Sequence, residues 1–176
     1  MTNQELKIFL DIPDDLDEMW THVALFGGMV DGAHDDYSLA NNFRQAGDIL
    51  IQRGLGDIDA HELLYPVLYN YRHAIELYLK AIVKPKERNH DLSKLMKQFN
   101  KFIQETHSEK VPAWFEELIG EFIKFDPKAT TFRYPGRTSA PEEHMVDLPK
   151  LQKIMGILSE AFHRVFHAEK KLKKTP

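Results

Sequence analysis

Hydrophobic and polar residues recur with a helical period through most of the chain. The clearest case is Tyr65 to Val83, YPVLYNYRHAIELYLKAIV, in which apolar side chains cover well over half of the helical circumference. A helix this apolar must be surrounded by other elements. We therefore expect a central helix from about Ala60 to Pro85, because Pro66 fits near the start of a helix and Pro85 ends it.

Similar patterns predict four further helices, near residues 37–53, 91–103, 112–123 and 147–171. Gly54 stops the first of these, Asp91 is suited to cap the second, and Pro112 to open the third.

The regions outside these helices are less regular. Leu16 to Phe26 has a helical spacing, whereas Lys7 to Ile12 is also compatible with a short strand. The turn-rich Asp31 to Asp36 predicts a linker, so residues 1–34 are expected to form an N-terminal extension to a helical domain at 35–176. Phe125 to Pro149 contains several prolines and no period, which predicts a long loop, and long loops are often functional.

Polar residues form one stripe on the central helix. Arg72, Glu76 and Lys80 follow one another at intervals of four, the spacing at which opposite charges meet. The stripe is either a solvated seam or the lining of a groove or subunit contact. Asn70 lies at the edge of the apolar arc and is expected to bond a neighbouring helix or loop.

Composition narrows the class of protein. With 176 residues and 43% hydrophobic content, the chain suits a single soluble domain. The absence of cysteine excludes disulfides, thiolate nucleophiles and Cys-ligated zinc. The sequence has neither a leader peptide pattern nor an apolar run of membrane-spanning length, so a cytoplasmic protein without a membrane partner is expected. The net charge of -4 argues against a whole-surface grip on nucleic acid but allows a local basic patch.

Three blocks in the chain resemble the HEPN superfamily. They are YRHAIELYLKAIV in the central helix, NHDLSKL from Asn89 to Leu95, and FRYPG from Phe132 to Gly136, and the resemblance spans roughly residues 35–172. It implies an all-α bundle of four core helices in a nucleotide- or RNA-associated protein, many relatives of which belong to toxin–antitoxin and other defence systems. It also implies a homodimer.

Catalytic HEPN proteins are metal-independent ribonucleases that use an Arg followed, after four to six residues, by a His. In this chain only Arg137 and His144 have this spacing. An Arg can stabilise charge on a phosphoryl group, and a His can transfer a proton near neutral pH. The match is imperfect, because the residues between them look like loop and include the adjacent Glu142 and Glu143.

Arg133 and Tyr134 belong to a block that matches as a whole. Arg133 either clamps the loop or binds phosphate. If the loop folds back over the central helix, Arg133 would meet other candidate nucleotide- or RNA-binding residues, which are Arg72, His73 and Lys80. His90 either packs at the entrance of its helix or contacts a ligand directly.

Other chemistry has weaker support. His163 and His167 lie four residues apart, but no third metal ligand accompanies them. No glycine-rich phosphate loop is present, so we expect neither metal nor cofactor. The sequence thus favours a binding module for RNA or nucleotide without strong catalysis. A ribonuclease using Arg137 and His144, and an interaction subunit that pairs with a nucleotidyltransferase or an antitoxin, are the alternatives.

Overall fold

A computed structural model of the chain describes residues 8–9, 24, 27, 35–55, 60–134 and 143–172. The chain divides into two units, Met1–Ala33 and His34–Pro176. The helix expected at Leu16 to Phe26 and most of the alternative strand at Lys7 to Ile12 lie outside the described residues.

The second unit is all-α, as expected. Its helices are α2 (Asp36–Gly54), α3 (Ala60–Val83), α4 (Leu92–His107), α5 (Ala113–Phe125) and α6 (Leu148–Leu172). Within the described ranges each helix begins and ends close to the position that the hydrophobic period predicts.

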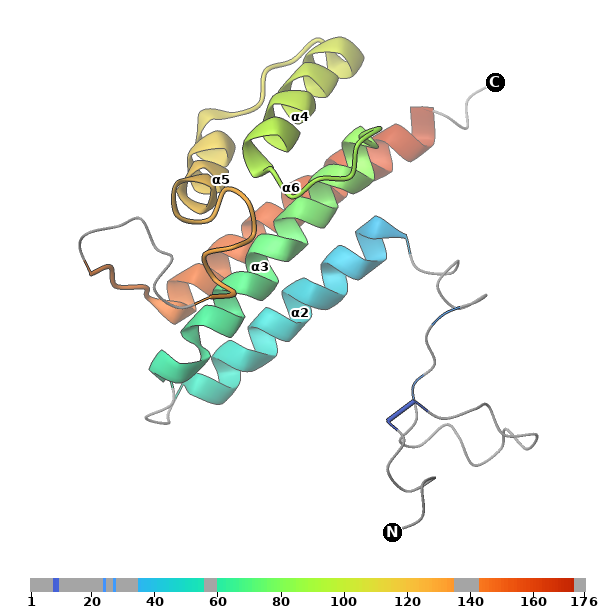
Figure 1. Cartoon of the computed structure of the whole chain (residues 1–176). Coiled ribbons are helices and arrows are strands. Elements are labelled where there is room, and N and C mark those ends of the chain that lie inside the picture. Colours follow the sequence, from blue (N-terminus) through green and yellow to red (C-terminus); the bar gives the residue numbers. More distant parts are fainter. Residues whose placement is uncertain are drawn as a thin grey trace. The chain divides into compact units, whose positions relative to one another are not determined.

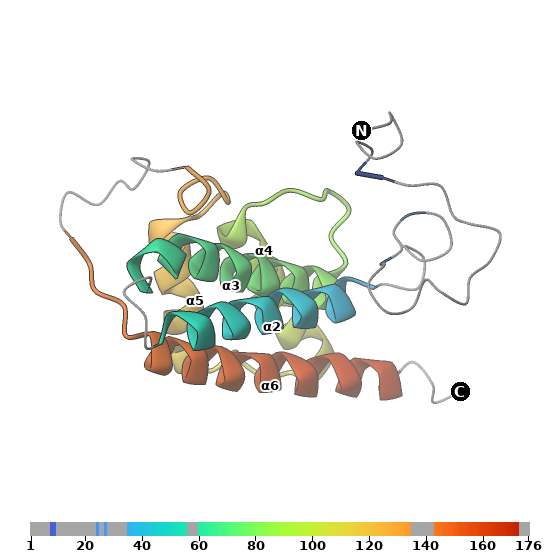
Figure 2. The same ribbon diagram turned by 90° about the horizontal axis from the view of Figure 1, so that it is seen from below.

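Helix α3 is the centre of this unit (Figure 1). Helices α2 and α3 run antiparallel, α6 packs against both, and α4 and α5 lie on the side of α3 away from α2 (Figures 1 and 2). Helix α3 is surrounded as its sequence predicts: Tyr71, Ala74, Ile75 and Leu79 have no exposed surface. Phe99 of α4, Phe115 of α5 and Phe162 of α6 join the two sides, with ring centroids 5.1 to 6.1 Å apart.

Short polar contacts fix the helix ends and the α2–α3 pair. Asp91 caps α4 by accepting a bond from the Lys94 backbone N–H at 3.0 Å. The Tyr78 hydroxyl donates to Asn41 of α2 at 2.7 Å, and burial raises its pKa to about 12, so it stays a donor. The expectation for Asn70 was wrong: its amide donates to the Pro66 carbonyl of its own helix at 2.8 Å.

Candidate functional site

The polar stripe of α3 is buried. Arg72 and Glu76 have no exposed surface, and Lys80 is 4% exposed. The expected pairing within the helix is confirmed, because Glu76 accepts from Arg72 through Oε2 and from Lys80 Nζ through Oε1 at 2.6 Å. The expectation of a solvated seam is wrong, because the chain after α5 and the chain before α4 cover this stripe.

Arg72 ties three segments together. Its Nε donates to the Asp126 carbonyl at 3.1 Å and lies 3.8 Å from the Asp126 carboxylate. Its Nη2 donates to the carbonyls of His90 at 2.5 Å and Pro127 at 3.3 Å. The Leu92 N–H also donates to the Pro127 carbonyl, at 3.1 Å. A buried guanidinium with this many acceptors is a structural clamp between α3, the start of α4 and the end of α5.

Asp126 shapes the loop that follows α5. Its Oδ1 accepts backbone bonds from Thr130 at 2.7 Å and Thr131 at 3.1 Å. Ala129 within this turn has a positive φ of 58°. The turn is therefore closed by one buried carboxylate, which also faces Arg72 and so connects the loop to the ion pairs of α3.

The charges of the buried cluster, which consists of Arg72, Glu76, Lys80 and Asp126, nearly balance. Burial favours the neutral form of Glu76, but hydrogen bonds and charges from Lys80 and Arg72 outweigh it and hold its pKa below the ordinary value. His90 Nδ1 lies 2.9 Å from Glu76 Oε1, and the His90 side chain is 59% exposed. His90 is therefore the exposed residue that contacts the buried Glu76 carboxylate.

His73 lies outside this cluster. It packs against Phe43 of α2 at 4.4 Å between ring centroids and stacks on Tyr69 at 5.9 Å. Burial lowers its pKa, partly opposed by Glu76. His73 is thus held as a neutral ring between α2 and α3.

Arg133 and Tyr134 are exposed on the loop after α5. Arg133 Nε donates to the Ala129 carbonyl, and its guanidinium lies 5.7 Å from the centroid of the Tyr134 ring. The loop does fold onto α3, since Phe132 packs against Tyr65. However, Arg72 and Lys80 face Glu76 rather than solvent, so the three cations do not line an open groove.

The second candidate pair is placed only in part. His144 is exposed, and its ring lies 4.8 Å from the Phe125 ring at the end of α5. Arg137 lies outside the described residues. The convergence of Arg137 and His144 therefore stays a prediction.

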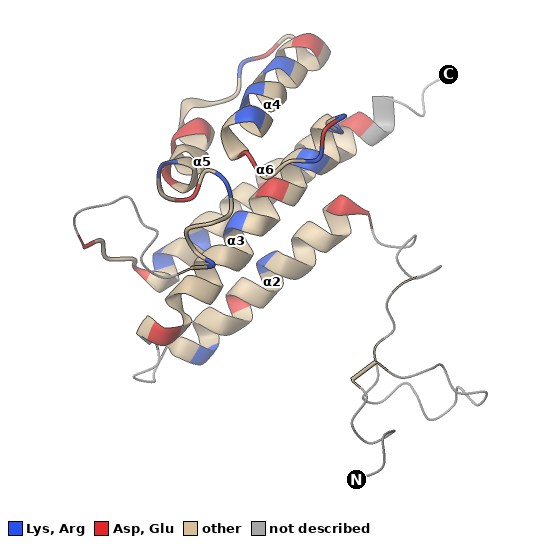
Figure 3. Cartoon of the chain, viewed as in Figure 1, with Lys and Arg blue, Asp and Glu red and all other residues tan. Residues whose placement is uncertain are grey.

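A basic face on α4 was not singled out by the sequence reasoning. We call the exposed Lys94, Lys97 and Lys101 of this helix, together with Lys128, the α4 basic face. The three helix lysines are spaced by three and four residues and so share one side of α4, and Figure 3 shows the basic positions along it. The bond between Pro127 and Leu92 brings the loop with Lys128 against the start of α4.

Acidic residues border this face. Lys101 pairs with Glu105 at 3.7 Å, both exposed, and Glu116 of α5 accepts a hydrogen bond from Asn100 of α4. The sequence feature that indicates the basic face is the lysine spacing in LSKLMKQFNK, which belongs to no catalytic motif.

The two histidines of α6 make a separate cluster. The Tyr37 hydroxyl lies 2.6 Å from His163 Nδ1, and the His163 and His167 rings are 4.1 Å apart between centroids. In the part of the chain that the structure describes, no three His, Cys, Asp or Glu side chains gather as a metal site would require. No helix among the described residues combines the length and apolarity needed to cross a bilayer.

No protein-family model matches the chain, and no curated protein or solved structure matches it.

Proposed function

We propose that the chain is an HEPN-like RNA- or nucleotide-binding protein that acts in the cytoplasm and contacts phosphates through the α4 basic face. The observation that supports this proposal is the exposure of Lys94, Lys97 and Lys128 at the junction that Arg72 ties together. Lysines that follow one helix face can neutralise successive phosphates. His90 and Arg133 are exposed on the loops before α4 and after α5, and Arg72 donates to the carbonyls of His90 and Pro127 in these loops.

The buried cluster has a supporting role in this proposal. Arg72 bonds to the carbonyls of His90 and Pro127 and so holds the start of α4 and the loop after α5 in place, while Lys80 is paired with Glu76 and is not free to contact phosphate. Arg72 and Lys80 belong to the first of the three resembling blocks, and Arg133 belongs to the third. We therefore propose that the blocks position the surface cations. We also propose that the protein acts in a defence or toxin–antitoxin system.

Fluorescence anisotropy with a short labelled single-stranded RNA tests this proposal. Replacing Lys94, Lys97 and Lys128 by Gln should weaken binding and lower the slope of log affinity against log salt by about 2, since each lost phosphate contact on a single strand removes about 0.7. The matched control replaces Lys150 and Lys153, two exposed lysines of α6, by Gln and should change neither quantity. Equal losses in both variants would contradict the proposal.

The ribonuclease alternative is separated from simple binding by incubation of structured RNA with the protein in EDTA. The exposed position of His144 beside α5 supports this alternative. A binding module leaves the RNA intact. Cleavage that disappears in His144→Ala would instead assign His144 a catalytic role, with Arg137 as its expected partner in a homodimer. RNA that is neither bound nor cleaved would favour an interaction subunit of a nucleotidyltransferase or antitoxin.

A further inference from the structure

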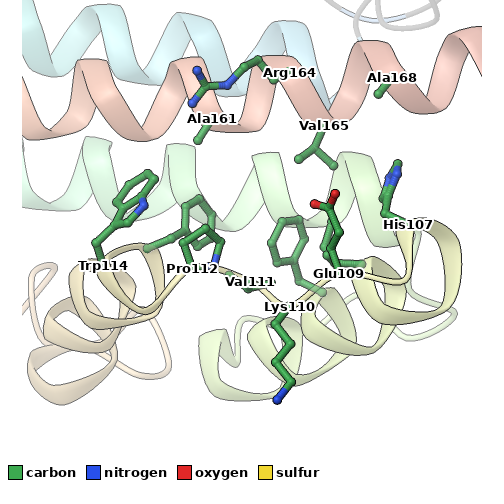
Figure 4. Close-up of a pocket in the computed structure, with 13 residues that line it drawn as sticks. His107, Glu109, Lys110, Val111, Pro112, Trp114, Ala161, Arg164, Val165 and Ala168 are labelled. Carbon is green, nitrogen blue, oxygen red and sulfur yellow. The ribbon is translucent and has the colours of Figure 1, made fainter.

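A groove with a volume of about 350 Å³ lies between the α4–α5 connection and α6, and it has no part in the proposed RNA contact. Its floor is apolar and buried, formed by Phe99, Ile103 and Phe115. Figure 4 shows Val165 and Ala161 of α6 forming the opposite side. This size lies within the range of small-molecule sites, which are mostly apolar with a few polar groups.

Two cations, Lys110 and Arg164, line this groove. Arg164 of α6 is exposed, lines the groove and makes no ion pair with the described part of the chain. In Figure 4 its guanidinium extends toward the end of the groove at which Trp114 lies. A planar guanidinium without a partner is suited to bind a carboxylate through two parallel hydrogen bonds.

Aromatic surface is exposed at the same end. Trp114 is 39% exposed although it lines an otherwise buried floor.

The remaining charges limit the ligand. Figure 4 shows the Glu109 carboxylate directed toward α6 and the Lys110 side chain pointing away from it. Glu109 opposes a polyanion such as a triphosphate because a second negative charge would lie near it. A ligand with one negative group beside Arg164 and an uncharged body along the apolar floor fits this arrangement.

We propose that this groove binds a small amphipathic monocarboxylate, whose carboxylate pairs with Arg164 and whose apolar body covers Phe99, Ile103 and Val165. The apolar body supplies affinity by leaving water, and Arg164 supplies selectivity for an acid over an uncharged compound.

Isothermal titration calorimetry of the full chain with octanoate and with octan-1-ol tests the proposal. Octanoate should bind more tightly than octan-1-ol, and Arg164→Gln should weaken octanoate about tenfold or more, the loss typical of a charge-assisted pair, while leaving octan-1-ol unchanged. The control Arg133→Gln removes an exposed Arg that does not line the groove and should change neither affinity.

A second variant tests the location without relying on charge. Ala161→Trp fills the groove with an indole and should abolish binding of both ligands, with circular dichroism unchanged. Failure of the wild-type chain to bind octanoate would overturn the proposal, as would an octanoate affinity that is the same in Arg164→Gln. Because neither variant touches the α4 basic face, RNA binding is measured independently of this outcome.

Discussion

Glu76 carries the negative charge on which two buried cations depend. Arg72 and Lys80 both donate to its carboxylate. The Asp126 carboxylate lies 3.8 Å from Arg72 as a second acidic partner, whereas Lys80 has no other acidic partner in the described part of the chain. Removing one member of a buried ion cluster leaves the others uncompensated, which is far more costly than losing an exposed pair.

Glu76→Gln should therefore lower the free energy of unfolding by about 3–5 kcal/mol, measured by urea denaturation. The matched control is Glu105→Gln, which breaks the exposed pair with Lys101 and should cost about 1 kcal/mol or less. Similar losses in the two variants would show that the cluster does not hold the fold together.

His73 should make the stability of the fold depend on pH, because burial opposes its protonation. Burial lowers its pKa below the ordinary value of 6.5, so below that pH the unfolded chain binds a proton that the folded chain resists. Stability should then fall as the pH drops below 6.5 toward the folded pKa. His73→Phe keeps an aromatic ring against Phe43 and should flatten this part of the profile in thermal melts across pH. A profile that keeps its slope in the variant would assign the dependence to another group.

At the scale of elements, Gly47 sets the distance between α2 and α3. A Cβ at this position would lie 2.5 Å from Tyr71 Cε1, and Tyr71 is held because its hydroxyl donates to Asp48 at 2.6 Å. The two helices thus approach closely only because this position has no side chain.

Gly47→Ala should destabilise the chain by about 1–3 kcal/mol, since overpacking outweighs the gain in helix propensity. The control is Gly120→Ala in α5, where nothing lies within 4 Å of the added Cβ, and it should stabilise the chain by up to about 1 kcal/mol. The measurement is the shift in the urea midpoint. Stabilisation by both changes would mean that α2 moves freely away from α3.

The helices themselves follow from local patterns. Period, Asp91 as a cap and Pro112 as a start are all visible within a few residues, and the structure places α4 and α5 accordingly. The burial of the polar stripe on α3 cannot be predicted from the local sequence. Arg72 meets carbonyls 18 and 54 residues away, and spacing within one helix gives no information on what covers it.

At the scale of the whole molecule, net charge is a poor guide to this candidate site. The chain is acidic overall, with a net charge of -4, yet four exposed lysines gather on α4 and the loop beside it. Arg133 is a candidate because of the FRYPG block and stays a prediction, whereas the place of Lys128 depends on the fold, which brings Pro127 against Leu92. Local charge rather than total charge therefore decides whether RNA can bind.

We propose that RNA covers the α4 basic face, and lysine acetylation read by mass spectrometry tests this in the chain without substitutions. RNA should protect Lys94, Lys97 and Lys128 from the reagent while Lys150 and Lys153 of α6 react as in its absence. Equal reactivity of Lys94, Lys97 and Lys128 with and without bound RNA, or protection confined to α6, would contradict the claim.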